Sequence, residues 1–576
     1  MKTPSFFERS ELAAALWAFR REFSVCMLFT VVVNVLMLTP TLYMLQVFDR
    51  VMLSQSEFTL AALTLVMLFF FAVMAFAEWS RSRLLVRIGV RLDELLNSRV
   101  FKAGFEASLK QRGRSPAQAF SDLTNVRQFM TGNGLFAFMD APWTPIYILV
   151  LFMLHPWLGM LAIFFSLLLV VMARLSHVLT HAPVEAALEA GGQVNQYVQS
   201  KLKNAEVIES MGMLGDLRRL WQIRHQRYLA LNWQASDMSA RVQALTKFVR
   251  YTQQSLALGA GALLVIDGEL SPGAMIAANV LMGRATQPLD MMVGTWKSFL
   301  GTRQSFLRLE ELLAEHPQRN AGLVHDVPRG QMRIENLVAT APSREQPILK
   351  GLTADFPAGQ VIGVIGPSGS GKSTLARALV GIWPYTQGRV LLDGEPIDSW
   401  DREELGPFIG YLPQDIELFE GTIAENIARF GELDPDKVIR ACQRSGVHDM
   451  ILHFPKGYDT PMGEAGNLLS GGQRQRIGLA RAMYGDPSVL VLDEPNSNLD
   501  DVGETALVRA VQDLKAQGKT VFLITHRTSI LGVTDRLLLL QDGAITHYGP
   551  RQEVIAALQP KPGPAAAPGN AIPQPA

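Results

Sequence analysis

The amino-acid sequence predicts a membrane α-helical bundle of six transmembrane helices, followed by an α/β domain built around a phosphate-binding loop. Residues from about 24 to 296 contain long apolar runs, whereas residues from about 332 to 558 have the pattern of a soluble α/β domain. Hydrophobic residues make up 48% of the 576 residues and the mean hydropathy is +0.15, both high for a soluble protein. A chain of this length is expected to hold several domains.

Four apolar runs are strong candidates for membrane spans. A helix of about 20 uncharged residues crosses the ~30 Å hydrocarbon core, and Phe58–Ala77 carries no charge. A turn at His155-Pro156 would join two of the other runs into a helical hairpin at the outer membrane face. The remaining three runs are Val25–Tyr43, Trp143–Leu154 and Trp157–Ala173.

Two weaker candidates, Ser255–Ile266 and Gly273–Gly294, are separated by the polar turn Asp267–Pro272. If both chain ends are cytoplasmic the number of spans is even, and six is the natural count. Arg284 lies deep in the sixth candidate, where charged side chains usually face a cavity or a partner. It could line a transport pathway, form a salt bridge with Asp290, or already lie at the inner interface.

The charge distribution places the amino terminus in the cytoplasm, because basic loops stay inside. Arg20 and Arg21 precede the first span, no cleavable signal peptide is evident, and Arg50 is the only basic residue in the expected outer turns. The long segments between spans two and three, and between four and five, are basic and helix-compatible. Within them, 120–132 and 204–217 are candidate contacts with the soluble half. The formal net charge of zero gives no indication of nucleic-acid binding, and the two distant cysteines do not suggest a disulfide or metal site.

The stretch GPSGSGKST fits the phosphate-loop pattern between an apolar strand and a helix. Its glycines let backbone N–H groups surround phosphates, and the helix directs its positive amino-terminal end at the anion. Lys372 would reach the β- and γ-phosphates of ATP, and the Ser373 hydroxyl would bind Mg²⁺. The expected binding residues are Gly366, Pro367, Ser368, Gly369, Ser370, Gly371, Lys372, Ser373 and Thr374.

Two acids end a second apolar strand, at Asp493 and Glu494. Phosphoryl transfer needs mainly positioning and charge neutralisation, so Asp493 could hold Mg²⁺ while Glu494 polarises the attacking water. His526 ends a third strand, where it could contact the γ-phosphate. Taken singly, His526 and Gln414 are more often structural residues.

This ordered set, together with the stretch LSGGQ, resembles the nucleotide-binding domain of ATP-binding cassette (ABC) transporters over about 332–558. The resemblance implies a catalytic glutamate, Glu494, assisted by Lys372, His526 and Gln414, with Gln414 also near the metal. It implies that the signature residues of one chain face the nucleotide held by a partner chain, and hence a dimer. The implied signature and D-loop residues are Leu469, Ser470, Gly471, Gly472, Gln473 and Asp500.

One position departs from the family pattern. Ala341 stands where the family usually has an aromatic ring stacked on adenine, so adenine stacking is in doubt. Losing such a ring would cost about 1 kcal/mol, by analogy with aromatic pairs. Phosphate and Mg²⁺ contacts should still hold the nucleotide.

The membrane half resembles that of type I secretion ATPases, through the stretches Thr39–Leu60, Phe138–Gly159 and Met282–Asp290. Because only about 23 residues precede the first span, the branch that exports alkaline proteases, lipases and haemophores is expected. The resemblance implies a homodimer in the bacterial inner membrane, with a periplasmic adaptor, an outer-membrane channel and a secreted protein carrying a carboxy-terminal signal.

Two other functions stay open: an exporter of lipids, peptides or small molecules with the same architecture, and a non-pumping module, which the presence of Glu494 disfavours. The expected organisation has five parts: a cytoplasmic segment (1–23), the transmembrane domain (24–315), a linker (316–331), the nucleotide-binding domain (332–558) and a disordered proline-rich tail (559–576).

Overall fold

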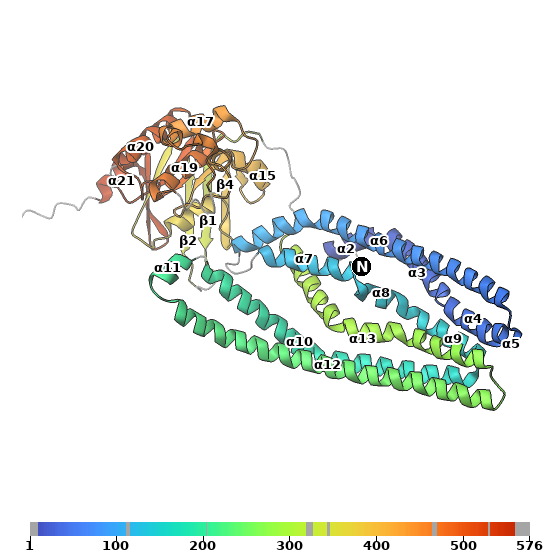
Figure 1. Ribbon diagram of the computed structural model, residues 1–576. Helices are drawn as coiled ribbons and strands as arrows, with labels where there is room; N and C mark the ends of the chain where they lie inside the picture. Colours follow the sequence, from blue (N-terminus) through green and yellow to red (C-terminus); the bar gives the residue numbers. More distant parts are fainter. Residues whose placement is uncertain are drawn as a thin grey trace, which may run out of the picture. The chain divides into compact units, whose positions relative to one another are not determined.

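The protein is described by a computed structural model that covers residues 10–110, 116–202, 204–317, 326–341, 346–462, 469–527 and 530–558. The chain divides into a helical unit that ends at Pro317 and an α/β unit that follows it (Figure 1). The expected tail lies outside the described residues. The two units are described separately below.

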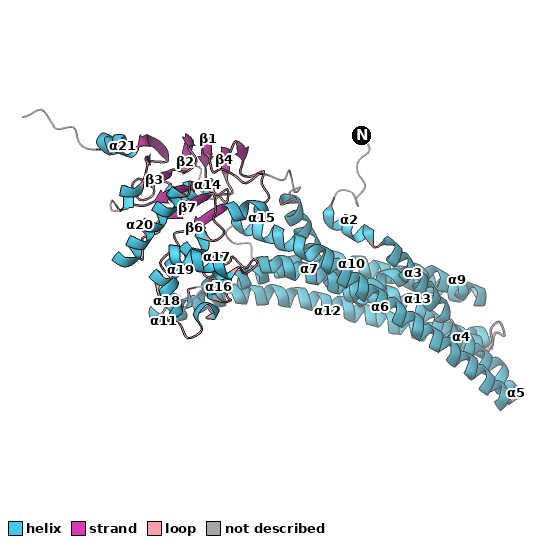
Figure 2. Cartoon of the chain, turned by 90° about the horizontal axis from the view of Figure 1, so that it is seen from above, coloured by secondary structure: helices cyan, strands magenta, loops and turns pink. Residues whose placement is uncertain are grey.

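Long helices make up the helical unit, as Figure 2 shows by its cyan ribbons. Four helices exceed 40 residues in the described part of the chain, so at 1.5 Å per residue the longest extends about 80 Å, far more than a membrane thickness. The predicted helical extensions beyond the spans are therefore confirmed. The helices are α2 (Glu11–Ala18), α3 (Arg20–Leu36), α4 (Thr39–Gln46), a π-helical turn (Val47–Val51), α5 (Met52–Ser54), α6 (Glu57–Lys110), α7 (Pro116–Thr131), α8 (Asn133–Asp140), α9 (Thr144–Leu154), α10 (Pro156–Leu202), α11 (Ala205–Ser210), α12 (Leu214–Ile266) and α13 (Pro272–Glu315).

Four helical segments among the described residues are long and apolar enough to cross a membrane: Arg20–Ser54, Glu57–Leu109, Gly134–Leu154 and Pro156–Lys201. They contain the four strong candidates from the sequence. The weaker fifth and sixth candidates lie on α12 and α13, so the count of six remains a prediction. Both predicted turns are found, since α9 and α10 are separated by the extended residue His155, and α12 and α13 by residues 267–271.

The expected outer turns are tied to one another by polar contacts. Asp49, in the π-helical turn, accepts hydrogen bonds from the Ser271 hydroxyl at 2.5 Å and the Gly273 amide at 2.9 Å. It thereby satisfies a donor at the start of α13 that the helix itself leaves unpaired. His155 Nε2 lies 3.0 Å from Glu269 Oε2. Both contacts converge on the turn between α12 and α13.

An ion pair between a buried carboxylate and a half-exposed guanidinium joins α7 to α13. The Asp122 side chain is 3% exposed and accepts two hydrogen bonds from Arg308, from Nε at 2.9 Å and Nη2 at 2.5 Å. The Ser305 hydroxyl donates to the same carboxylate at 2.8 Å. These bonds with Asp122 also raise the pKa of the Arg308 guanidinium.

Two sheets form the α/β unit. The first is antiparallel, in the order β2-β1-β4-β5, and the second has the order β10-β9-β3-β8-β7-β6, with parallel pairing from β9 to β6. The strands are β1 (Met332–Ala339), β2 (Leu349–Phe356), β3 (Val361–Ile365), β4 (Thr386–Leu392), β5 (Glu395–Pro396), β6 (Ile409–Leu412), β7 (Val489–Asp493), β8 (Thr520–Ile524), β9 (Arg536–Gln541) and β10 (Ala544–Pro550).

The central strands β3, β7 and β8 consist almost entirely of buried apolar residues, as expected for a parallel sheet covered on both faces. Helices cover the sheets, and a cluster of buried apolar residues forms a separate core around α16 to α19. The helices are α14 (Lys372–Leu379), α15 (Arg402–Leu405), α16 (Ile423–Ile427), α17 (Pro435–Arg444), α18 (His448–Leu452), α19 (Gly471–Met483), α20 (Asp501–Ala516) and α21 (Arg551–Leu558).

Candidate functional site

The strand order of the parallel sheet brings the predicted site residues to one edge. In open α/β sheets, ligands bind beyond the carboxyl ends of the strands. Here the phosphate loop follows β3, His526 follows β8, the Asp493–Glu494 pair ends β7, and Gln414 follows β6. Residues that are more than 150 positions apart in the sequence therefore line up along neighbouring strands.

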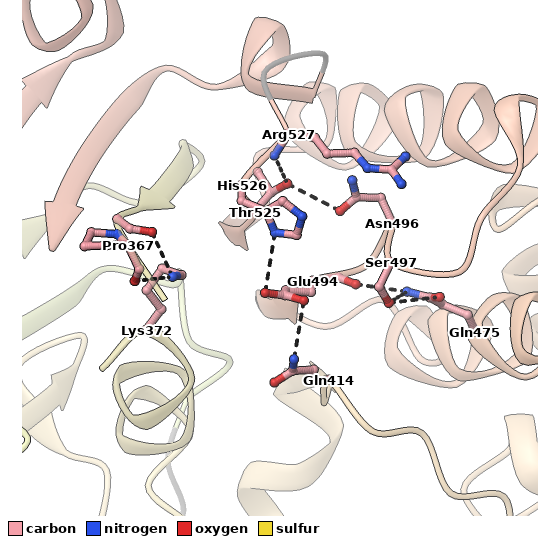
Figure 3. Close-up of polar contacts among 11 residues, drawn as sticks. Pro367, Lys372, Gln414, Gln475, Glu494, Asn496, Ser497, Thr525, His526 and Arg527 are labelled. Atoms are coloured by element: carbon pink, nitrogen blue, oxygen red, sulfur yellow. Dashed lines mark hydrogen bonds and ion pairs between the residues drawn. The ribbon is translucent and has the colours of Figure 1, made fainter. Parts of the chain in front are cut away.

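The phosphate loop has a backbone that requires glycine at two places. Gly366 has φ +154°, and a Cβ there would lie 2.1 Å from the Leu540 carbonyl oxygen. Gly371 has φ +100°, in the region that disfavours other residues. The loop residues from Gly366 to Gly371 then lead into α14, which begins at Lys372 as predicted. Lys372 Nζ lies over the loop and donates to the carbonyl oxygens of Gly366 and Pro367, both at 2.9 Å (Figure 3).

Asp493 is a buried carboxylate suited to holding a cation. It is 1% exposed, and neither carboxylate oxygen has a hydrogen-bond partner among the described residues. Burial raises its pKa, with a contribution from the Glu494 charge, while the nearby Ser373 side chain and the charges of Arg377 and Lys372 act in the opposite direction. Buried charges normally have partners, so this environment fits a divalent cation shared with the Ser373 hydroxyl.

Glu494 lies at the centre of the cluster in Figure 3. Its Oε2 is 3.4 Å from Gln414 Nε2, and its Oε1 is 3.6 Å from His526 Nδ1. The structure thus brings together three of the four residues expected to act in hydrolysis, which follow β6, β7 and β8. Glu494 also has φ +51°, a left-handed conformation that is uncommon outside glycine and often found at functional sites.

The signature stretch forms the start of α19. Ser470 is its N-cap, with the Ser470 hydroxyl accepting from the Gln473 amide at 3.3 Å and Gln473 Oε1 accepting from the Ser470 amide at 2.9 Å. Leu469 is buried in the core cluster around α16 to α19, so its side chain anchors the loop. Gly472 packs against the Asn498 carbonyl, where a Cβ would lie at 2.7 Å.

Asp500 caps the next helix, α20, through a 2.9 Å bond from the Gly503 amide. Its Oδ1 lies 3.9 Å from Arg476 Nη2 on the signature helix. The predicted D-loop residue is therefore placed beside α19.

The structure corrects one expectation in the helical unit. Asp290 pairs with Arg250 on α12, at 2.8 Å, and not with Arg284. Arg284 is half-buried, and its Nη1 donates a hydrogen bond to Gln287 Oε1 at 3.2 Å on the same helix. The proposed Arg284–Asp290 salt bridge is wrong because Asp290 faces the neighbouring helix.

Two residues in the site were not singled out from the sequence. Gln475 and Asn496 are 2% and 1% exposed, and each contacts the segment around Glu494 or the strand end before His526. Their polar side chains lie on buried faces, a signal that would have been visible only once the orientation of α19 was known.

Comparisons with known proteins agree with this geometry. The family model described as ABC transporter matches residues 349–497, and the ABC transporter transmembrane region matches residues 23–289. A bacterial Atm1-family ABC exporter with ATP bound has a similar fold, with a TM-score of 0.81 at 22% identity, covering 94% of this chain and 96% of that chain.

Relatives align with nearly the whole chain. The type I secretion system ATP-binding protein PrsD of Rhizobium meliloti is 43% identical over 545 residues, covering 94% of each chain. The cyclolysin secretion/processing ATP-binding protein CyaB of Bordetella pertussis is 29% identical, covering 96% of this chain and 78% of that protein. The leukotoxin export ATP-binding protein LtxB of Aggregatibacter actinomycetemcomitans is 27% identical, covering 95% and 78%. The chain therefore belongs to the ABC transporters and, within them, to the type I secretion ATP-binding proteins.

Proposed function

We propose that this chain is one half of a homodimeric pump in the bacterial inner membrane, which uses ATP hydrolysis to export an unfolded protein with a carboxy-terminal signal. The observation that carries the proposal is the end-to-end similarity to a type I secretion protein, combined with the Gln414 and His526 side chains beside Glu494. A periplasmic adaptor and an outer-membrane channel would complete the pathway, with both chain ends in the cytoplasm. Export of a protease, lipase or haemophore is the expected branch.

In this proposal the residues of the α/β unit divide the work of ATP hydrolysis. Lys372 and the loop amides bind the phosphates, and Glu494 orients and polarises the attacking water. Mg²⁺ would be held by Ser373 and Asp493, with Gln414 nearby, and would neutralise phosphate charge. His526, 62% exposed at its side chain, is free to turn from Glu494 towards the γ-phosphate.

The signature residues Ser470, Gly471 and Gly472 would complete the nucleotide site of the partner chain. Two ATP molecules then close the dimer, the long helices transmit the closure through the segments 120–132 and 204–217, and hydrolysis reopens the dimer. Mixed dimers test this arrangement. Lys372→Ala in one chain and Ser470→Arg in the other place both defects in one site, so partial activity is expected. Activity no better than in either homodimeric variant would contradict it.

The choice of cargo is tested by reconstituting the protein in lipid vesicles. A carboxy-terminal peptide from a secreted protein should stimulate ATPase activity, and a scrambled peptide should not. Stimulation by lipids alone, without any response to the peptide, would favour a lipid exporter of the same architecture. Loss of turnover and of export in Glu494→Gln would exclude a non-pumping module.

Arg284 is proposed to form a polar wall of the polypeptide pathway, because a half-buried guanidinium that forms no ion pair among the described residues is costly against lipid. Arg284→Leu should reduce secretion while leaving the amount of protein in the membrane unchanged. Lys297→Leu, at an exposed position further along α13, serves as a matched control. Normal secretion by Arg284→Leu would refute the proposed role.

A further inference from the structure

Gln475 lies four residues after Gly471, the first residue of the signature helix, and faces the loop that follows β7. Its Nε2 donates to the Glu494 carbonyl oxygen at 3.0 Å, and its Oε1 accepts from the Asn498 amide at 2.9 Å. The Ser497 hydroxyl lies 3.3 Å from Nε2 and 3.4 Å from Oε1. Because Gln475 is 2% exposed, these contacts are shielded from water. Its side-chain amide donates a hydrogen bond to one end of the segment from Glu494 to Asn498 and accepts one from the other end.

The backbone of Glu494 needs such support. Its φ of +51° is left-handed, a conformation that is unfavourable for a residue other than glycine and persists only where the surroundings fix it. The Glu494 amide donates to the Ile524 carbonyl of β8 at 3.0 Å. Its carbonyl accepts from the Ser497 amide at 3.2 Å and from Gln475. The neighbouring strand, the local turn and the signature helix together fix the peptide groups on both sides of Glu494.

The carboxylate of Glu494 is held much less tightly than its backbone. Its contacts to Gln414 at 3.4 Å and His526 at 3.6 Å exceed the usual hydrogen-bond lengths. The direction in which the carboxylate points is therefore set mainly by the backbone conformation. Figure 3 shows Lys372 and Gln475 on opposite sides of Glu494, so Gln475 acts from behind the carboxylate and does not face the phosphate loop.

We propose that Gln475 is a positioning residue for ATP hydrolysis, a role that rests on the hydrolytic function proposed above for Glu494. It holds the Glu494 backbone in the left-handed conformation that aims the carboxylate, and it connects this conformation to the signature helix. Since Ser470 is the N-cap of α19, a shift of this helix when the signature loop engages a nucleotide would move the Glu494 carbonyl. Gln475 thus links the nucleotide contacted through Ser470 to the hydrolytic group of the same chain.

Gln475→Met tests the role in the full-length protein, since methionine fills a similar volume without the two hydrogen bonds. A misplacement of about 1 Å can cost about a hundredfold in rate, so kcat should fall about tenfold to a hundredfold. The ATP dissociation constant, measured with a fluorescent analogue, should stay within about threefold. Gln475→Glu keeps an acceptor for the Asn498 amide but cannot donate to Glu494, so it should lose kcat as well. Gln512→Met, on the exposed face of α20, is the matched control and should match the unmodified protein.

The double variant Gln475→Met/Glu494→Gln distinguishes positioning from a general structural effect. If Gln475 acts through Glu494, the double variant loses no more activity than Glu494→Gln alone, whereas independent losses would multiply and refute the proposal. A kcat within about twofold of the unmodified protein in both Gln475 variants would also overturn it. Normal turnover in Glu494→Gln would overturn the role proposed for Glu494 itself. If Glu494→Gln loses turnover while both Gln475 variants keep it, only the role of Gln475 is overturned. If Gln475→Met does not fold, the isosteric Gln475→Glu variant decides the result.

Discussion

Asp493→Asn should stabilise the nucleotide-free protein even though it removes a group proposed for hydrolysis. Asp493 is 1% exposed, and its two carboxylate oxygens have no hydrogen-bond partner among the described residues. An unpaired buried polar group costs about 1–3 kcal/mol and a charged one costs more. The amide of asparagine is still an unpaired polar group, so the variant relieves only the additional cost of the charge, on the order of 1–3 kcal/mol. At about 2–4 °C per kcal/mol for a domain of roughly 150–250 residues, the variant should unfold about 2–12 °C higher.

The stability gained in Asp493→Asn should also depend on pH, in a direction that can be checked. Because burial raises the pKa of Asp493 above that of the unfolded chain, the ionised carboxylate disfavours folding at neutral pH. Protonation relieves this cost as the pH falls through the raised pKa. The advantage of Asp493→Asn should therefore shrink towards acid pH and be largest at neutral pH.

Thermal unfolding with and without Mg²⁺ and ATP provides the assay, at one fixed scan rate. A ligand at 100 times its dissociation constant stabilises a protein by about 2.7 kcal/mol. The unmodified protein should gain this stability, and the variant should lose the part that depends on Mg²⁺. Asp513→Asn, at an exposed position on α20, is the control. A nucleotide-free variant that is less stable than the unmodified protein, or that keeps the full Mg²⁺-dependent gain, would refute the reasoning.

Three further predictions concern other contacts. Asp122→Leu and Arg308→Met should each lower the unfolding temperature, and a double-mutant cycle should give a coupling of about 0.5–3 kcal/mol; strict additivity would contradict the ion pair. Ala341→Tyr should tighten ATP binding by about 1 kcal/mol, or about fivefold, in a titration with a fluorescent analogue; unchanged affinity would place adenine elsewhere. Ser470→Asp should keep its thermal stability, because aspartate is a good N-cap, yet lose ATPase activity through repulsion of phosphate. Ser470→Asn is its uncharged control, and equal activity in the two variants would argue against an anion at this loop.

Local patterns explain which features could be predicted from the sequence. The uncharged run Phe58–Ala77 and the turn at His155 depend on neighbouring residues, and both are found in the structure. The strand, loop and helix around Lys372 are equally local, since glycine spacing and an apolar strand determine them. The strand ends suggested roles for Glu494 and His526, and the resemblance of the ordered motifs to ABC transporters supported them. The two side chains lie close together once β7 and β8 pair.

Pairings between distant helices could not be predicted in this way. A salt bridge with Asp290 was one of three alternatives for Arg284, but the partner of Asp290 is Arg250 on α12. Asp122 lies in a segment read as a contact with the soluble half, yet its side chain is buried against Arg308. Which face of a long helix meets its neighbour depends on packing over the whole bundle, and the composition of one helix does not determine it.

The signature loop shows how one residue can serve both the fold and the proposed chemistry. A serine hydroxyl has one donor and two acceptor positions, and capping of α19 uses Ser470 as an acceptor for the Gln473 amide. Its O–H remains able to donate to an anion. The amides of Gly471 and Gly472 are the first two of the helix, which have no partner within it, and the positive end of the helix favours negative charge. The helix cap therefore prepares the loop to bind phosphate, and the bond from Gln475 to the Glu494 carbonyl, one helical turn further along, connects that loop to the group proposed to activate water.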